Sequence, residues 1–96
     1  MKAAEKTTFA SVWDALADTP EEAANLKLRA QLMHEIANVV KESAMKQEQA
    51  AEQCGITQPR RNDLLKGKVS RFSLDALVNI GARVGVALQV IAPRAA

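Results

Sequence analysis

The 96-residue sequence is poor in the residue types that build disulfide frameworks and metal centres, with one cysteine, one histidine, three aromatic residues and no tyrosine. Because Cys54 is the only cysteine, an intramolecular disulfide is excluded, and its place on the inner side of a predicted helix favours a small buried apolar residue. His34 has no nearby cysteine or second histidine, so we expect a surface histidine and no metal site. The sequence has no signal peptide and no apolar run long enough to span a membrane, so we expect a cytoplasmic protein.

Patterns that carry catalysis are also absent from the sequence. The carboxylate pairs Glu21 with Glu22 and Glu48 with Glu52 are explained more simply by helix caps and helix surfaces than by general acid and base roles. No phosphate-binding glycine loop and no nucleophile elbow is present. The sequence therefore predicts neither an enzyme nor a bound cofactor.

The most informative segment that is present runs from Gln47 to Lys68 and predicts two short helices joined by a tight glycine turn. Ala51 is small where the two helices must cross closely, and Gly55 stands where the chain leaves the first helix with a positive φ. Thr57 is the expected N-cap of the second helix, and Pro59 suits its first turn, where no intrahelical donor is needed. Two helices joined in this way can place the second one in the major groove of DNA.

The second helix of this pair is predicted to have one apolar face and one polar face. Leu64 and Leu65 face inward, and Gly67 ends the helix. The outer arc carries Arg60, Asn62, Asp63 and Lys66. Positive charge is concentrated here, because residues 46–71 hold six basic and three acidic side chains in a chain whose net charge is +2. Such a local excess is suited to neutralising nucleic-acid phosphates.

The remaining segments predict the scaffold of a compact all-α bundle of about five helices. Thr19 to Glu22 form a capping box that opens a long helix running to about Ser43. The apolar stripe of that helix consists of Leu26, Ala30, Met33, Ile36, Ala37 and Val40. Ser73 is the expected N-cap of a last helix, which ends at Gly85. We expect a single domain over residues 1–96, made of an N-terminal arm or helix (1–19), a helical core (20–85) that contains the helix-turn-helix (47–67), and a short strand (86–92).

The segment Val86 to Ile91 predicts that strand, because it is rich in β-branched residues and Pro93 follows closely. A lone strand leaves its backbone groups unpaired, and the only weak partner in the chain is Lys6 to Phe9. Pairing with the same strand of a second subunit, through Val86, Leu88 and Val90, would give a two-fold homodimer. Such a dimer would present two recognition helices to half-sites about 34 Å apart on one face of DNA.

The N-terminal segment carries a second apolar face. Phe9, Val12, Trp13 and Leu16 follow the i, i+3, i+4, i+7 spacing of one side of a helix. Two readings are open: the four side chains cover the protein's own core, or they form part of a surface for a protein partner.

From about Leu32 to Gly85 the sequence resembles the XRE family of Cro and phage-repressor type helix-turn-helix proteins, and the whole chain resembles the HigA-like antitoxins within that family. The matching residues are Gln47, Ala51, Gly55, Ile56, Thr57 to Pro59, Leu64 and Lys66 to Lys68. The resemblance implies a lambda-repressor-like fold in which Gln47 touches a phosphate and Gln58, Arg60 and Asn62 face base edges. It also implies a small RelE/HigB-like ribonuclease toxin as a protein partner.

Three positions depart from the family pattern. Lys46 stands where serine or threonine usually caps the first helix, and Ala44 stands where glycine usually ends the preceding one. Arg61 stands where an aliphatic residue normally packs inward. Because an unpaired buried guanidinium is costly, we expect Arg61 to reach solvent or to pair with an acid such as Glu52.

The sequence thus predicts a dimeric transcriptional regulator that binds a palindromic double-stranded DNA operator and represses its own promoter. The predicted base-reading residues are Thr57, Gln58, Arg60 and Asn62, and the predicted phosphate-binding residues are Gln47, Lys66, Lys68 and Arg71. The alternative is a toxin-neutralising interaction module that keeps the helix-turn-helix scaffold but has lost DNA binding. Lys46, Arg61 and Asp63 favour that alternative, because they weaken the capping, the packing or the positive charge of the motif.

Overall fold

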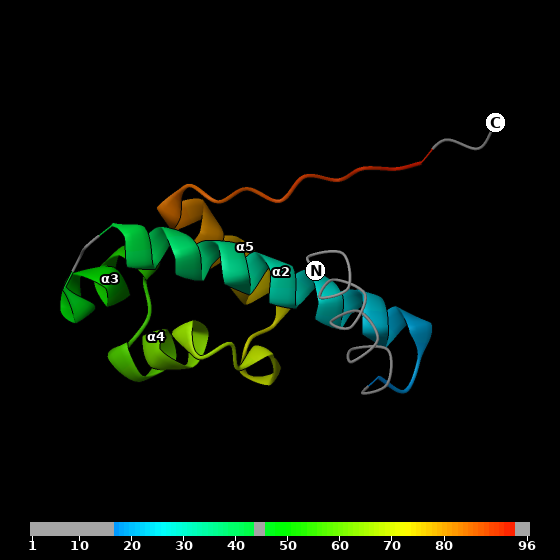
Figure 1. The fold of residues 1–96 in the computed structure, drawn as a ribbon, viewed down its shortest axis with the longest axis horizontal. Helices are drawn as coiled ribbons and strands as arrows, with labels where there is room; N and C mark the ends of the chain where they lie inside the picture. The colour runs from blue at the N-terminus through cyan, green and yellow to red at the C-terminus, as the bar shows by residue number, and fades with distance from the viewer. Residues whose placement is uncertain (1–16, 44–45, 94–96) are drawn as a thin grey trace, which may run out of the picture.

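The computed structural model describes residues 17–43 and 46–93. These residues form four α-helices and one short 3₁₀ helix in the order α2 (Pro20–Glu42), α3 (Gln47–Cys54), α4 (Gln58–Leu65), η1 (Val69–Arg71) and α5 (Leu74–Val84) (Figure 1). The prediction of a mainly helical fold is therefore confirmed, with four helices rather than five in the described part. The N-terminal face predicted from Phe9, Val12, Trp13 and Leu16 lies outside the described residues.

Helix α2 is the central element of the fold, and it crosses the length of Figure 1 with α4 and η1 on one side. It begins where the capping box predicts, because the Thr19 side chain accepts a hydrogen bond from Glu22 N at 3.1 Å. Its buried residues are Ala23, Leu32, Met33, Ile36, Ala37 and Val40. Most of the predicted stripe is therefore confirmed, although Leu26 and Ala30 are only half-buried and Leu32 was not expected.

The apolar core lies where α2, α3, α4 and α5 meet. Ile36, Leu64 and Leu77 have no exposed surface, and Cys54 is 2% exposed, which places the lone cysteine in the core as predicted. Phe72, between η1 and α5, is 1% exposed and is the largest of these fully buried side chains. None of the described polar or charged residues is fully buried, so the core holds together by apolar packing.

Helix α5 is capped as the sequence predicts, but its end makes a contact that the sequence did not indicate. The Ser73 side chain accepts a hydrogen bond from Ala76 N at 3.1 Å, and Gly85 ends the helix with φ +84°. Val86 N then donates to the Gly81 carbonyl at 2.8 Å. A Cβ atom at Gly81 would lie 2.7 Å from the Val86 carbonyl oxygen, so only glycine permits this close approach.

The strand predicted over Val86 to Ile91 is not formed in the single chain. Residues 86–93 have no regular secondary structure and run away from the helices (Figure 1). Val90 and Ile91 are 89% and 85% exposed, and Leu88 is 38% exposed. The physical reason is that a strand is defined by hydrogen bonds to a neighbouring strand, and the described part of the chain offers none. The weak partner considered for it, Lys6 to Phe9, lies outside the described residues.

Candidate nucleic-acid interface

The turn between α3 and α4 has the geometry that the sequence predicts. Gly55 adopts φ +71°, and Ile56 N donates to the Ala51 carbonyl at 3.0 Å to close the turn. Ala50 and Ala51 are both buried, at 0% and 5% exposed, because short side chains are needed where the two helices approach each other. A Cβ atom at Gly55 would also lie 2.6 Å from Arg83 Nε, but that flexible side chain can move aside, so the positive φ is what favours glycine here.

Helix α4 is held at both ends by local contacts. The Thr57 side chain accepts a hydrogen bond from Arg60 N at 3.3 Å, and Pro59 lies in the first turn. After the helix, Gly67 adopts φ +73°, and Lys68 N donates to the Asp63 carbonyl at 3.0 Å. The predicted caps are therefore confirmed. Helix α4 therefore begins and ends at defined residues, and these bounds determine which side chains lie on its outer face.

Three of the predicted DNA-contacting residues share one exposed stripe of α4. Gln58, Asn62 and Lys66 are spaced four residues apart, which places them on one face of a helix. All three are exposed, as is Thr57, whereas Leu64 is completely buried. The last two of the predicted phosphate contacts, Lys68 and Arg71, follow α4 and are also exposed. Gln47 begins α3, but its side chain lies outside what the structure describes.

Arg60 is directed toward the scaffold rather than outward. Its guanidinium carbon lies 4.2 Å from the centroid of the Phe72 ring, which is a cation–π contact. Its Nη1 donates to the Arg71 carbonyl at 2.7 Å, and the residue is half-buried. To reach a base edge the side chain would have to leave both partners. Its role in base reading therefore stays a prediction, and the structure assigns it a contact within the protein.

Arg29, which the sequence analysis did not single out, anchors the same loop from α2. Its Nη1 donates to the carbonyl oxygens of Val69 and Phe72 at 3.1 and 3.0 Å, and its Nε donates to Asn25 Oδ1 at 2.6 Å. Together with Arg60, it satisfies three carbonyl groups in and just after η1, which also carries Arg71. The spacing of Asn25 and Arg29 on one face of α2 was the only signal in the sequence, and it does not reveal the contact to η1.

Arg61 is the least satisfied polar residue of the motif. Among the described residues it forms no ion pair, so of the two expected arrangements the pairing with Glu52 is not found, and the half-buried side chain reaches the surface at Nη1. Its Nη1 donates to Asn62 Oδ1 at 3.2 Å, but its Nε is buried without a hydrogen-bond partner. Burial raises the pKa of the neighbouring Cys54 thiol, and the positive charges of Arg61 and Arg83 partly oppose that rise. Arg61 therefore lies against the core, where an unpaired N–H group is destabilising.

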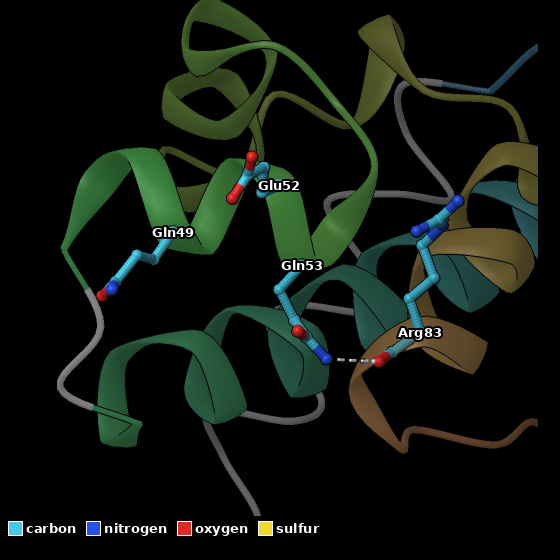
Figure 2. A pocket seen from close by; sticks show the side chains of 4 residues that line it. All are labelled: Gln49, Glu52, Gln53 and Arg83. Carbon is cyan, nitrogen blue, oxygen red and sulfur yellow. Dashed lines mark hydrogen bonds between the residues drawn. The ribbon is translucent and has the colours of Figure 1, made fainter.

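A shallow hollow of about 590 Å³ lies between α3 and the end of α5 (Figure 2). It is lined by Gln49, Glu52, Gln53 and Arg83, and Gln53 Nε2 donates to the Arg83 carbonyl at 2.9 Å. This hydrogen bond ties the first helix of the motif to the scaffold. In the described ranges no cluster of three or more histidine, cysteine or acidic residues could hold a metal ion. Nor does any helix there have the length and apolar character needed to cross a bilayer.

Comparison with known protein families finds a match to a helix-turn-helix family. A family described as a helix-turn-helix domain matches residues 15–92, which includes every helix described above. Among curated proteins, none matches the chain.

The unpartnered Nε of Arg61 leads to a prediction about stability. We expect Arg61→Leu to raise the free energy of unfolding by about 1–2 kcal/mol, because it removes a buried N–H group without a partner and adds apolar contact beside Cys54. Urea denaturation followed by circular dichroism measures the change. Lys66→Leu is the matched control on the exposed side of α4 and should have little effect. A less stable Arg61→Leu protein would show that the guanidinium is well accommodated.

Proposed function

Because the chain belongs to this helix-turn-helix domain family, we propose that it is a sequence-specific DNA-binding transcriptional regulator. The observation that carries the proposal is the division of α4 into a buried side at Leu64 and an exposed polar stripe of Gln58, Asn62 and Lys66. A short helix of this kind, fixed by a left-handed glycine turn and an N-cap, can enter the major groove without disturbing the core.

Base reading is assigned to the first half of α4. Gln58 is the best candidate, because its exposed amide offers the paired donor and acceptor that adenine presents in the major groove. Asn62 lies on the same stripe one turn later and takes a neighbouring adenine or a phosphate. Thr57 is exposed at the start of the helix. Arg60 binds a guanine only if that contact is more favourable in free energy than its contacts with the Phe72 ring and the Arg71 carbonyl.

Phosphate binding is assigned to residues that flank this stripe. The exposed cations are Lys66, which is the C-cap of α4, and Lys68 and Arg71 in the segment after it. Gln47, at the start of α3, is the fourth phosphate contact. These contacts fix the register of the protein on the duplex and supply most of the salt-sensitive affinity.

The protein acts as a homodimer in this proposal, and the segment after Gly85 joins the two copies. Its support is that residues 87–91 are exposed and follow an extended path (Figure 1), with Leu88, Val90 and Ile91 open to solvent, whereas Val86 packs against the core. Pairing with the same segment of a second copy would satisfy the backbone groups and cover Leu88 and Val90. A two-fold dimer of this kind suits a palindromic operator.

We further propose that the regulator is the antitoxin of a two-gene module and neutralises a small RelE/HigB-like toxin. The support is the resemblance of the whole chain to the HigA-like antitoxins within the XRE family. The N-terminal segment with Phe9, Val12, Trp13 and Leu16 is the surface we assign to the toxin, because its spacing predicts an apolar helix face.

Two substitutions on the DNA-facing surface should behave differently. Gln58→Ala is expected to relax preference at one base pair, at a cost of about 1–3 kcal/mol in binding free energy. Lys68→Ala should weaken binding to all sequences alike and lower the salt dependence by about one phosphate contact. Titration of labelled promoter DNA and of a shuffled duplex at two salt concentrations separates the two effects. Equal effects of both variants on both duplexes would reject this division of roles, and absence of binding would favour a pure interaction module.

The dimer is tested by proline substitution in the C-terminal segment. Successive strand residues point their N–H groups to opposite edges, so either Gln89→Pro or Val90→Pro must remove a paired donor. We expect one of them to convert a dimer into a monomer at micromolar concentration, measured by sedimentation velocity. Val90→Thr keeps a β-branched residue and its N–H, and it should remain dimeric. A wild-type monomer, or two proline variants that both stay dimeric, would contradict the strand pairing.

The antitoxin role is tested by co-expression with the neighbouring small open reading frame. We expect the two proteins to copurify, and we expect Trp13→Ala to reduce the recovered partner, because truncating a central aromatic anchor removes much of its contact area. Lys68→Ala, which changes the DNA-facing surface, should leave the recovery unchanged. Failure of the wild-type protein to retain the neighbouring product would reject this role without affecting DNA binding.

A further inference from the structure

Asp63 holds two of the cations that the proposed function assigns to DNA phosphates. Its Oδ1 lies 3.5 Å from Lys68 Nζ, and its Oδ2 lies 3.8 Å from Arg71 Nη1. The Asp63 side chain is 17% exposed, whereas those of Lys68 and Arg71 are 45% and 59% exposed. The carboxylate is therefore the inner member of this cluster, and the two cations lie on its solvent side.

The loop that carries the two cations does not depend on these ion pairs for its path. Lys68 N donates to the backbone carbonyl of Asp63 at 3.0 Å, and Arg71 N donates to the Lys68 carbonyl at 3.0 Å. Arg60 and Arg29 hold the rest of the loop by hydrogen bonds to its carbonyl groups. Exposed ion pairs of this length contribute little to stability. The Asp63 carboxylate is therefore better explained by its effect on the positive charges of Lys68 and Arg71 than by a need to hold the loop in place.

At this place a carboxylate works against phosphate binding. Asp63 is the only acidic residue between Gln53 and Leu74, in a segment that otherwise carries only basic charges. A phosphate approaching Lys68 or Arg71 must displace the carboxylate or share the cation with it, and it also meets the negative charge itself. Screening is weak at this range, because the atoms lie well within the Debye length of about 10 Å at 0.1 M salt.

We infer that Asp63 limits sequence-independent binding to DNA by holding Lys68 and Arg71, and this inference rests on the proposed function. Phosphate contacts contribute to the binding of every sequence, so the competition lowers the affinity for promoter and random DNA by the same factor. The base-reading side chains Gln58 and Asn62 are uncharged, and the ion pairs of Asp63 are with Lys68 and Arg71, so base preference is unaffected. Asp63 is thus a positioning residue that sets the salt-sensitive part of the affinity.

The experiment measures binding of the full chain to a random-sequence duplex over a range of salt concentrations. Asp63→Asn is expected to raise the affinity about three- to tenfold near 0.1 M salt and to steepen the salt dependence by roughly one to two phosphate contacts. A merely structural role would lower the affinity instead. Preference between promoter DNA and a shuffled duplex should stay unchanged, because both gain the same phosphate contacts.

Two controls separate the local effect from net charge. Asp63→Glu keeps the carboxylate and should bind as the wild type does. Asp18→Asn makes the same change of charge at an exposed site just before α2 and should alter the affinity less than twofold. Asp63→Ala is a second test variant, since alanine is the best helix former, and thermal melts identify any variant that is unfolded.

The outcomes distinguish this inference from the proposed function. If the wild type binds DNA and folded Asp63→Asn and Asp63→Ala bind no more tightly, or gain only as much as Asp18→Asn, the inference fails alone. If the wild type does not bind but the Asp63 variants do, the inference stands and wild-type DNA binding as proposed fails. If no folded protein binds the duplex, both fail.

Discussion

The buried ring of Phe72 and the loop around it determine where the proposed DNA-facing cations lie. Among the described residues the Phe72 side chain is the largest that is fully buried, and it belongs to the same core cluster as residues of α2, α4 and α5. A loop pressed against an apolar core has carbonyl groups that are partly shielded from water; Arg29 satisfies two of these, and Arg60 binds the exposed carbonyl of Arg71. Burying the Phe72 ring therefore requires that the carbonyl groups of the surrounding loop find hydrogen-bond donors, and the two arginines supply them.

This arrangement also explains why Arg60 is not an ordinary surface residue. A guanidinium has several donors and a flat face, so it can stack on a ring and bind a carbonyl at the same time. The contact couples the reading helix to the loop that follows it. Movement of Arg60 toward DNA would leave the Arg71 carbonyl without its donor, so base contact at this residue and loop order are linked.

The sequence predicted the elements whose cause is local and missed the contacts that join distant segments. Thr19, Thr57 and Ser73 were identified as caps, and Gly55 as the turn, because a few neighbouring residues determine those features. By contrast, the Arg29 contacts span 40 and 43 positions, and no periodicity reveals them. Helical spacing predicted an outer arc of Arg60, Asn62, Asp63 and Lys66, but only Asn62 and Lys66 are exposed. The inward turn of Arg60 depends on Phe72, which no local pattern connects to it.

The strand predicted over Val86 to Ile91 is absent for a different reason, which is the lack of a pairing partner among the described residues. Its composition favours extended backbone, and the segment follows an extended path (Figure 1), but a strand also requires a partner, which the described part of the chain does not provide. Its starting direction is nevertheless determined, because glycine at position 81 lets the Val86 carbonyl sit directly against α5. In a dimer built on this segment, the distance between the two α4 helices would depend on where the segment leaves α5, and not on the helix-turn-helix itself. Operator spacing could then diverge among relatives through changes near Gly81, with the residues that read the bases left untouched.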